Sequence, residues 1–278
     1  MTTPSADAPA DPAEPSPASR LALLPAVGVS ASAFLLFALQ LAGWGHLLLA
    51  LSLLGAVLVS RELAKDLALI GIGITIVSTT SVVASVDWDR FLTIGAVLLL
   101  AVLVPAAVDR LLLRRRAIRF PLRTGEPWTR LEKGYIVAVP FLGWLILPFY
   151  FITSGVYRNW PHLADGGEVA RFFAGVNFVG TWDELFFICT CFALLRRHFG
   201  VWTANLLQAT IFVSFLWELG YQAWGPLLTV PFALLQGWLF ARTGSLLYVL
   251  IVHLLFDVVV FLAIVHARHP GAIPIFLV

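Results

Sequence analysis

Charged residues are scarce in this sequence. They make up 12% of the 278 residues, whereas an average soluble domain is about 25% charged. The net charge is only +2, so nothing indicates a nucleic-acid partner. Cysteine is nearly absent: positions 189 and 191 hold the two cysteines, and because residues i and i+2 of a helix diverge, we expect neither a disulfide nor a metal clip between them. Hydrophobic residues reach 60%, which predicts a polytopic membrane protein.

Long apolar segments follow one another along the chain. They cover residues 21–41, 47–60, 67–86, 91–108, 135–152, 172–195, 201–219, 227–241 and 245–265. Spanning a bilayer takes roughly 17–25 helical residues, and two of these segments, 47–60 and 227–241, are short. We therefore predict an all-α, polytopic transmembrane helix bundle of about nine spans, with eight as the alternative.

The composition divides the chain into five parts. These are a disordered N-terminal tail (1–19), a four-helix N-terminal membrane region (20–108), a basic cytoplasmic connector (109–134), a five-helix membrane core (135–266) and a C-terminal tail (267–278). The first tail is rich in Ala, Pro, Ser and acidic residues, so it cannot form a core, and it lacks the basic start of a signal peptide.

Lysine and arginine indicate how the spans are oriented. With nine spans, most of them fall on one side of the membrane, and the intervening loops hold only Arg90 and Arg158. Because such residues are enriched in cytoplasmic loops, we expect a multi-pass integral protein of the plasma (inner) membrane with a cytoplasmic N-terminus. We expect the connector to be solvated and to face lipid headgroups, rather than to form a specific lipid or partner site.

Ionisable side chains occur inside two of the predicted spans. Asp183 and Glu184 are adjacent in segment 172–195, and His253 lies four residues before Asp257 in the last segment. Helical rise places Asp183 roughly 20 Å and His253 roughly 16 Å from the same membrane edge. Because ionisable groups are costly at this depth, they favour a functional site. The four side chains could transfer protons, or they could form a polar cluster that ties the helices together.

Two short motifs in this part of the chain resemble a known family. Asp183, Glu184 and Ile188 align with Glu-Glu-x-x-x-Arg, with Asp for the first Glu and Ile for Arg. Phe212 and Leu216 align with Phe-x-x-x-His, with Leu for His. These are the first two motifs of the CPBP family, which comprises CAAX proteases and bacteriocin-processing intramembrane endopeptidases.

The third motif of that family, His-x-x-x-Asn/Asp, is matched in full by His253 and Asp257. The resemblance covers about residues 169–260. It implies an enzyme that hydrolyses peptide bonds of membrane-associated or C-terminally lipidated (CAAX-like) proteins. By the same resemblance, Glu184 or Asp183 would activate water, and His253 and Asp257 would assist.

Leu216 leaves a second interpretation open, because leucine cannot accept a proton. The protein could be a catalytically inactive pseudoprotease that acts as a membrane binding or regulatory protein. A transporter is a weaker alternative, since the two halves show no repeat. We expect no cofactor, although a metal ion stays possible; one histidine is too sparse for a tetrahedral zinc site. The expected partners are the lipid bilayer and a peptide or protein substrate, and the oligomeric state stays open.

Overall fold

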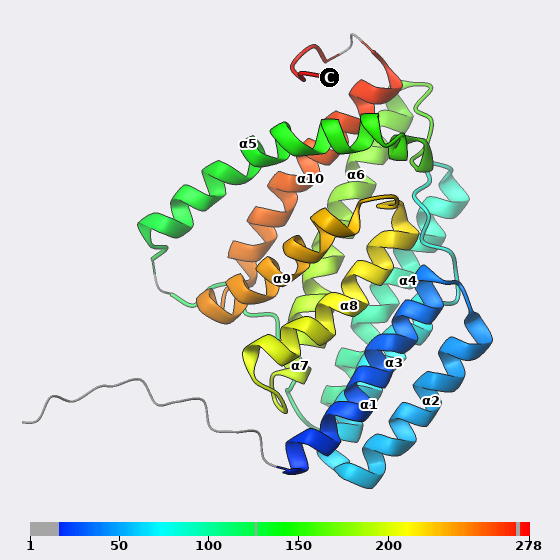
Figure 1. Ribbon diagram of the computed structural model, residues 1–278, viewed down its shortest axis with the longest axis vertical. Coiled ribbons are helices and arrows are strands. Elements are labelled where there is room, and N and C mark those ends of the chain that lie inside the picture. The colour runs from blue at the N-terminus through cyan, green and yellow to red at the C-terminus, as the bar shows by residue number, and fades with distance from the viewer. Residues whose placement is uncertain (1–16, 126, 271–272) are drawn as a thin grey trace, which may run out of the picture.

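The computed structural model describes residues 17–125, 127–270 and 273–278. Helices form all of the regular secondary structure in these ranges, which confirms the all-α prediction. The predicted disordered tail lies outside the described residues, apart from 17–19, which belong to the first helix. The elements are α1 (Pro17–Ala33), η1 (Phe34–Ala38), α2 (Ala42–Val59), α3 (Arg61–Val77), α4 (Trp88–Ala107), η2 (Val108–Leu112), α5 (Arg130–Thr153), η3 (Val156–Asn159), α6 (Gly166–Asp183), η4 (Glu184–Phe192), α7 (Ala193–Leu195), α8 (Val201–Leu219), α9 (Pro226–Thr243) and α10 (Leu246–Arg268) (Figure 1).

Six helical segments of the described chain are long and apolar enough to cross a membrane. They are Arg20–Ala38, Ala42–Val59, Trp88–Leu112, Arg130–Thr153, Gly166–Leu195 and Leu246–Arg268. The other three predicted spans coincide largely with α3, α8 and α9, which are 17, 19 and 18 residues long. The protein is therefore a multi-pass helical membrane protein, as its composition predicts.

The third apolar segment is shorter than the sequence predicts. It was expected to run over residues 67–86, but α3 ends at Val77 and residues 78–87 form a loop. Serine and threonine side chains cause this end, because their hydroxyls compete for backbone carbonyls. Ser78 Oγ donates to Thr75 O at 2.9 Å, and Thr79 Oγ1 donates to Ile76 O at 2.7 Å.

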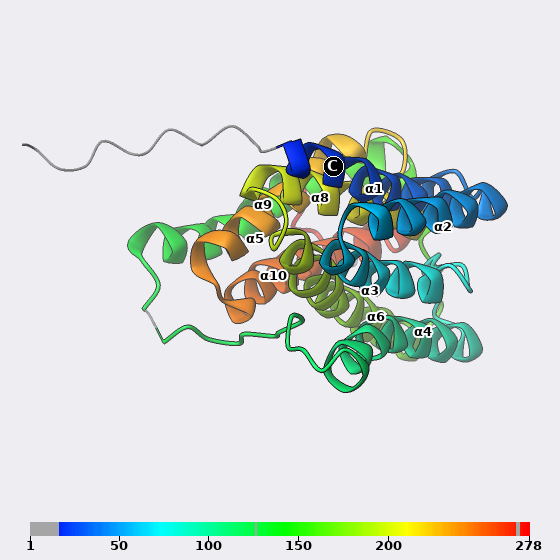
Figure 2. The same ribbon diagram turned by 90° about the horizontal axis from the view of Figure 1, so that it is seen from below.

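Two helices at the centre of the bundle separate an N-terminal from a C-terminal group. Helices α6 and α8 are central, with α1 to α4 on one side and α5, α9 and α10 on the other (Figures 1 and 2). Helix α1 packs on α8, α4 packs on α6, and α10 packs on both α6 and α5. The two long helices that carry the predicted site residues, α6 and α10, are thus direct neighbours.

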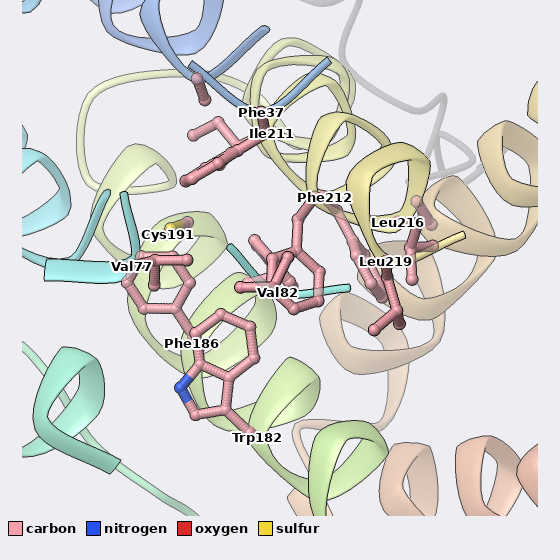
Figure 3. Packing of buried hydrophobic residues seen from close by; sticks show 14 of the residues in the cluster. Phe37, Val77, Val82, Trp182, Phe186, Cys191, Ile211, Phe212, Leu216 and Leu219 are labelled. Atoms are coloured by element: carbon pink, nitrogen blue, oxygen red, sulfur yellow. The ribbon is translucent and has the colours of Figure 1, made fainter. Parts of the chain in front are cut away.

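A dense aromatic core holds the end of α6 and the following η4 against α8. Trp182 stacks on Phe186 with ring centroids 5.1 Å apart (Figure 3), and Phe187 stacks on Phe212 at 4.3 Å. All four side chains are buried, and large buried aromatic rings contribute strongly to core stability. Cys189 and Cys191 lie in the same segment and are free and buried, so no disulfide joins them. This core fixes the helix that carries Asp183 and Glu184.

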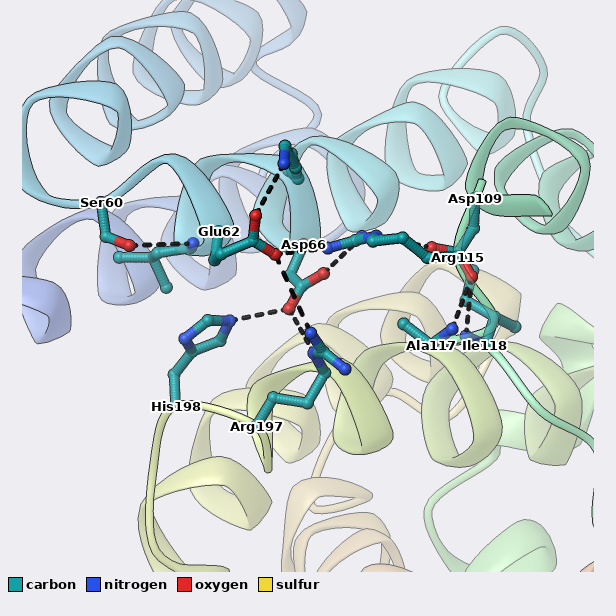
Figure 4. Close-up of polar contacts among 11 residues, drawn as sticks. Ser60, Glu62, Asp66, Asp109, Arg115, Ala117, Ile118, Arg197 and His198 are labelled. Atoms are coloured by element: carbon teal, nitrogen blue, oxygen red, sulfur yellow. Dashed lines mark hydrogen bonds and ion pairs between the residues drawn. The ribbon is translucent and has the colours of Figure 1, made fainter. Parts of the chain in front are cut away.

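A charged cluster centred on Asp66 joins the N-terminal helices to the rest of the chain. The Asp66 carboxylate is 1% exposed and accepts hydrogen bonds from Arg115, Arg197 and His198 at 2.7, 2.8 and 2.7 Å (Figure 4). Arg115 also donates to Asp109 at 3.1 Å. The cluster therefore connects α3 to the connector and to the turn between α7 and α8.

Candidate active site

The acidic pair lies where α6 changes into a π-helix. Segment η4 begins at Glu184, directly after Asp183, and continues for nine residues. Within it, Thr190 Oγ1 donates to Leu185 O, five residues earlier, at 2.9 Å. π-Helical turns are rare and occur frequently at functional sites. Because the turn is wider here, two adjacent carboxyl groups can lie on either side of one side chain of α10.

That side chain is the imidazole of His253. Its Nδ1 atom lies 2.7 Å from Glu184 Oε1, and as an N–H group it donates to this carboxylate oxygen. Gln236 of α9 donates its Nε2 to the same oxygen at 2.6 Å and to Val249 O at 3.2 Å. Glu184 is fully buried. Its Oε1 atom accepts from two donors, Gln236 and His253, and this shared acceptor fixes the orientation of the imidazole.

The other imidazole nitrogen faces the two remaining predicted carboxyl groups. His253 Nε2 lies 3.7 Å from Asp183 Oδ2 and 3.8 Å from Asp257 Oδ1. Both distances are too long for a direct hydrogen bond and short enough for one bridging water. Asp183 Oδ1, Glu184 Oε2 and Asp257 Oδ2 are buried and have no hydrogen-bond partner among the described residues. The structure thus brings the four predicted side chains together, with three carboxyl groups around one imidazole.

A glycine allows α6 and α10 to approach closely at this point. A Cβ atom on Gly180 would collide with Asp257 Oδ2 and would lie 3.2 Å from His253 Cδ2. Any larger residue would separate the two helices or displace both side chains. Gly180 is therefore a positioning residue that the sequence motifs did not reveal.

A cavity of about 460 Å³ leads to the cluster. Asp183, His253 and Asp257 line it, whereas Glu184 does not. Leu216 lines the same cavity, and so does Tyr221. Most of the remaining wall is apolar and comes from α4 and α6. A group that enters the cavity therefore meets Asp183 and the Nε2 side of His253.

The position of the cavity wall indicates where it is reached from. Leu92, Leu99 and Phe178 line it and are also exposed on the outside of α4 and α6. The end of the cavity away from His253 is lined by residues 82, 84 and 85 of the loop after α3 and by Arg171 near the start of α6. The cavity is thus reached from between α4 and α6, towards the end of the bundle opposite the Asp66 cluster.

Two further buried polar residues, Gln236 and Glu218, lie near the cluster or the cavity. Gln236 of α9 makes an interhelical hydrogen bond to Glu184, which places it beside the site. Glu218 lies at the end of α8. It is only 8% exposed and its Oε1 accepts from Val82 N at 3.3 Å, so it holds the loop that borders the cavity. Its partner lies 136 residues away in the chain, and no local signal indicates such a contact.

The described residues contain no group of His, Cys, Asp and Glu side chains arranged to hold a metal ion. The fold and the site together define a polytopic helical membrane protein with a buried acid–imidazole cluster. Residues 165–259 match the family model described as type II CAAX prenyl endopeptidase Rce1-like. The predicted resemblance to the CPBP family of CAAX proteases is confirmed for this segment, which includes all four predicted site residues. No curated protein and no solved structure matches the chain significantly.

Proposed function

We propose that the protein is an intramembrane endopeptidase that hydrolyses a peptide bond of a membrane-associated protein. The observation that carries this proposal is the convergence of Asp183, Glu184, His253 and Asp257 at a cavity reached from between α4 and α6. The match of residues 165–259 to a protease family supports the same reaction class.

The geometry favours Asp183 over Glu184 as the group that activates water. Asp183 lines the cavity and has a free carboxylate oxygen, whereas Glu184 lies outside it and is engaged by two donors. In the proposed reaction, Asp183 takes a proton from water as the water oxygen attacks the scissile carbonyl carbon. The same proton then passes to the leaving amine as the C–N bond breaks.

His253 is proposed to stabilise the oxygen that becomes negative. In the protonated imidazole both ring nitrogens carry a hydrogen. Nδ1 donates to Glu184, and Nε2 is left to donate to the carbonyl oxygen in the cavity. Asp257, 3.8 Å from Nε2, helps to keep the imidazole charged, and Gln236 keeps Glu184 in place.

The entrance of the cavity bears on the choice between substrates. With the basic end of the bundle at the cytoplasm, as the sequence predicts, the entrance lies in the opposite half of the bilayer. This favours a membrane-spanning or membrane-anchored segment as the substrate over a cytoplasmic, lipidated C-terminus. Proteoliposomes that contain either single-span reporter proteins or a farnesylated CAAX peptide would separate the two substrate types by their cleavage products.

Substitutions in those proteoliposomes test the reaction itself. Asp183→Asn should lower the cleavage rate about 10²–10⁴-fold, the usual contribution of a general base. His253→Ala should lower it about 10²–10³-fold, the usual contribution of one oxyanion donor, and the amount of folded protein should be unchanged in both variants. Glu218→Gln is the matched control, because it alters a buried carboxyl group outside the cluster. Glutamine keeps the Oε1 atom that accepts from Val82 N, so the loop should stay in place and the variant should cleave normally. Full activity in both site variants contradicts the proposal.

One observation favours a second function, that of a pseudoprotease. Leu216 supplies an aliphatic side chain to the same cavity as Asp183 and His253, where the related family has a histidine. A pseudoprotease would bind membrane proteins without cutting them. A wild-type protein that retains a reporter but releases no product, together with a Leu216→His variant that cleaves it, would identify this function.

A further inference from the structure

The connector between η2 and α5 carries most of the unbalanced positive charge of the protein. Residues 109–134 hold 8 of the 18 lysines and arginines and 3 of the 16 acidic residues. Their net charge is therefore 8 − 3 = +5, and the rest of the chain, at +2 − 5 = −3, is acidic overall. We call residues 110–130 the basic strap. Residues 113–125 of the strap run outside the helices, between η2 and α5 (Figure 2).

The fold itself uses one of the strap's arginines as an ion-pair partner. Arg115 pairs with Asp66, Asp109 and Glu62 at 2.7–3.1 Å (Figure 4). The other arginines of the strap are exposed, and none has a carboxylate partner among the described residues. They are Arg110, Arg114, Arg116, Arg119, Arg123 and Arg130. Their charges are therefore available to an anionic partner.

Exposed leucines lie among these arginines in the sequence. Leu111, Leu112 and Leu122 are among the most exposed large hydrophobic residues of the protein. A segment that presents both aliphatic side chains and guanidinium groups matches the boundary between acyl chains and headgroups. Arginine in particular can bind a phosphate oxygen pair through two parallel hydrogen bonds. The chemistry of the strap thus fits an anionic phospholipid better than a soluble anion.

The strap also holds the beginning of the helix that carries His253. The backbone N–H groups of Leu246 and Leu247 donate to Pro121 O and Leu122 O at 2.8 and 3.1 Å. The Ser245 hydroxyl donates to Leu122 O at 3.1 Å. The first N–H groups of a helix have no partner within the helix, so the strap supplies partners for two of those of α10.

We propose that the basic strap is a binding surface for anionic phospholipid headgroups, in which Arg119 and Arg123 contact the lipid phosphate. These two arginines flank the residues that hold α10, so a bound headgroup restrains the N-terminal turn of that helix. The proposal does not depend on peptide hydrolysis.

Lipid retention by the purified full-length protein tests this surface. The protein in neutral detergent is incubated with dioleoyl-phosphatidylglycerol or dioleoyl-phosphatidylcholine, and bound lipid is counted by native mass spectrometry. We expect phosphatidylglycerol to be retained preferentially. Arg119→Gln with Arg123→Gln should weaken its binding about 30-fold, which corresponds to about 2 kcal/mol.

The matched control is Arg20→Gln with Arg61→Gln. It removes the same charge from exposed arginines that lie outside the strap, at the starts of α1 and α3. This variant should bind phosphatidylglycerol like the wild type. Equal weakening in both double variants, equal retention of the two lipids, or equally effective competition by inorganic phosphate would each overturn the proposal.

Hydrogen exchange at α10 provides a second readout, which a strap with a purely structural role would not change. Phosphatidylglycerol should slow exchange of the Leu246 and Leu247 amides in the wild type and leave it unchanged in the Arg119/Arg123 variant. If the lipid binds without any effect on these amides in the wild type, the proposed restraint of α10 is wrong.

Discussion

Two buried charged clusters in this protein have opposite compositions. In the Asp66 cluster, one carboxylate is surrounded by two guanidinium groups and an imidazole, and both of its oxygens are hydrogen-bonded. In the His253 cluster, one imidazole is surrounded by three carboxyl groups, each with one buried oxygen that has no partner among the described residues. The first arrangement is complete. The second opens on a cavity.

This difference distinguishes a cluster that ties helices together from one that can react. A fully satisfied ion pair mainly fixes the positions of the elements that it joins. A cluster with an excess of one charge type and free acceptor atoms is poised to bind or transfer protons. We therefore expect substitutions in the Asp66 cluster to change stability and those in the His253 cluster to change activity.

The largest expected effect separates the two adjacent acids of the His253 cluster. Asp183→Asn should lower the cleavage rate about 10²–10⁴-fold, because it removes the proposed base. Glu184→Gln should cost less, about 10-fold to 100-fold, because it alters only the orientation of His253. Steady-state rates with a membrane reporter would measure both. A larger loss of rate in Glu184→Gln than in Asp183→Asn would show that Glu184 is the base and that Asp183 is not.

The next largest effect is on the free energy of unfolding of the protein, when the Asp66 cluster is altered. Asp66→Asn leaves Arg115 and Arg197 without their carboxylate partner, so we expect a loss of about 3 kcal/mol in the free energy of unfolding. Chemical denaturation in detergent micelles would measure this loss. Glu62→Gln alters an exposed partner of the same cluster and should leave stability unchanged. A stable Asp66→Asn variant with impaired cleavage would contradict the purely structural role of this cluster.

Gly180→Ala should affect both properties moderately. The added methyl group meets Asp257, and overpacking of this kind typically costs about 1–3 kcal/mol. Cleavage should fall as well, because α6 and α10 move apart. Gly55→Ala in α2 is the control, since a Cβ there meets no atom within 4 Å. Thermal unfolding and cleavage rates of the two variants should therefore differ, and equal behaviour would show that the close approach is unimportant.

The smallest expected effect is a pH dependence of stability below pH 4. Burial alone would raise the pKa of Asp66, but its hydrogen bond from His198 and the charges of Arg115 and Arg197 outweigh burial and lower the pKa below the ordinary 3.8. The stability that Asp66 contributes is therefore present above pH 3.8 and is lost as the pH falls through the lowered pKa. The stability difference between the wild type and Asp66→Asn should shrink as the pH falls below 3.8. A difference that stays constant down to pH 2 would contradict this cause.

The sequence predicted the proximity of the four polar side chains better than it predicted the local backbone. The spacing of His253 and Asp257 and the simple rise of two helices placed four distant side chains together, because long apolar helices have few ways to cross a bilayer. The π-helical turn at Glu184 was not predictable, since nothing in its apolar sequence distinguishes it from an ordinary α-helix. The early end of α3 and the contact of Glu218 with Val82 depend on individual hydrogen bonds, which periodicity does not indicate.

The isotope content of the cleavage product tests the central claim most directly. Proteoliposomes with a single-span reporter are incubated in water enriched in ¹⁸O, and the new C-terminus of the N-terminal fragment is analysed by mass spectrometry. We predict one ¹⁸O atom in the carboxyl group of the wild-type product and at least about 100-fold less product from His253→Ala. An intact reporter with the wild type, or normal labelled product from His253→Ala, would contradict the account.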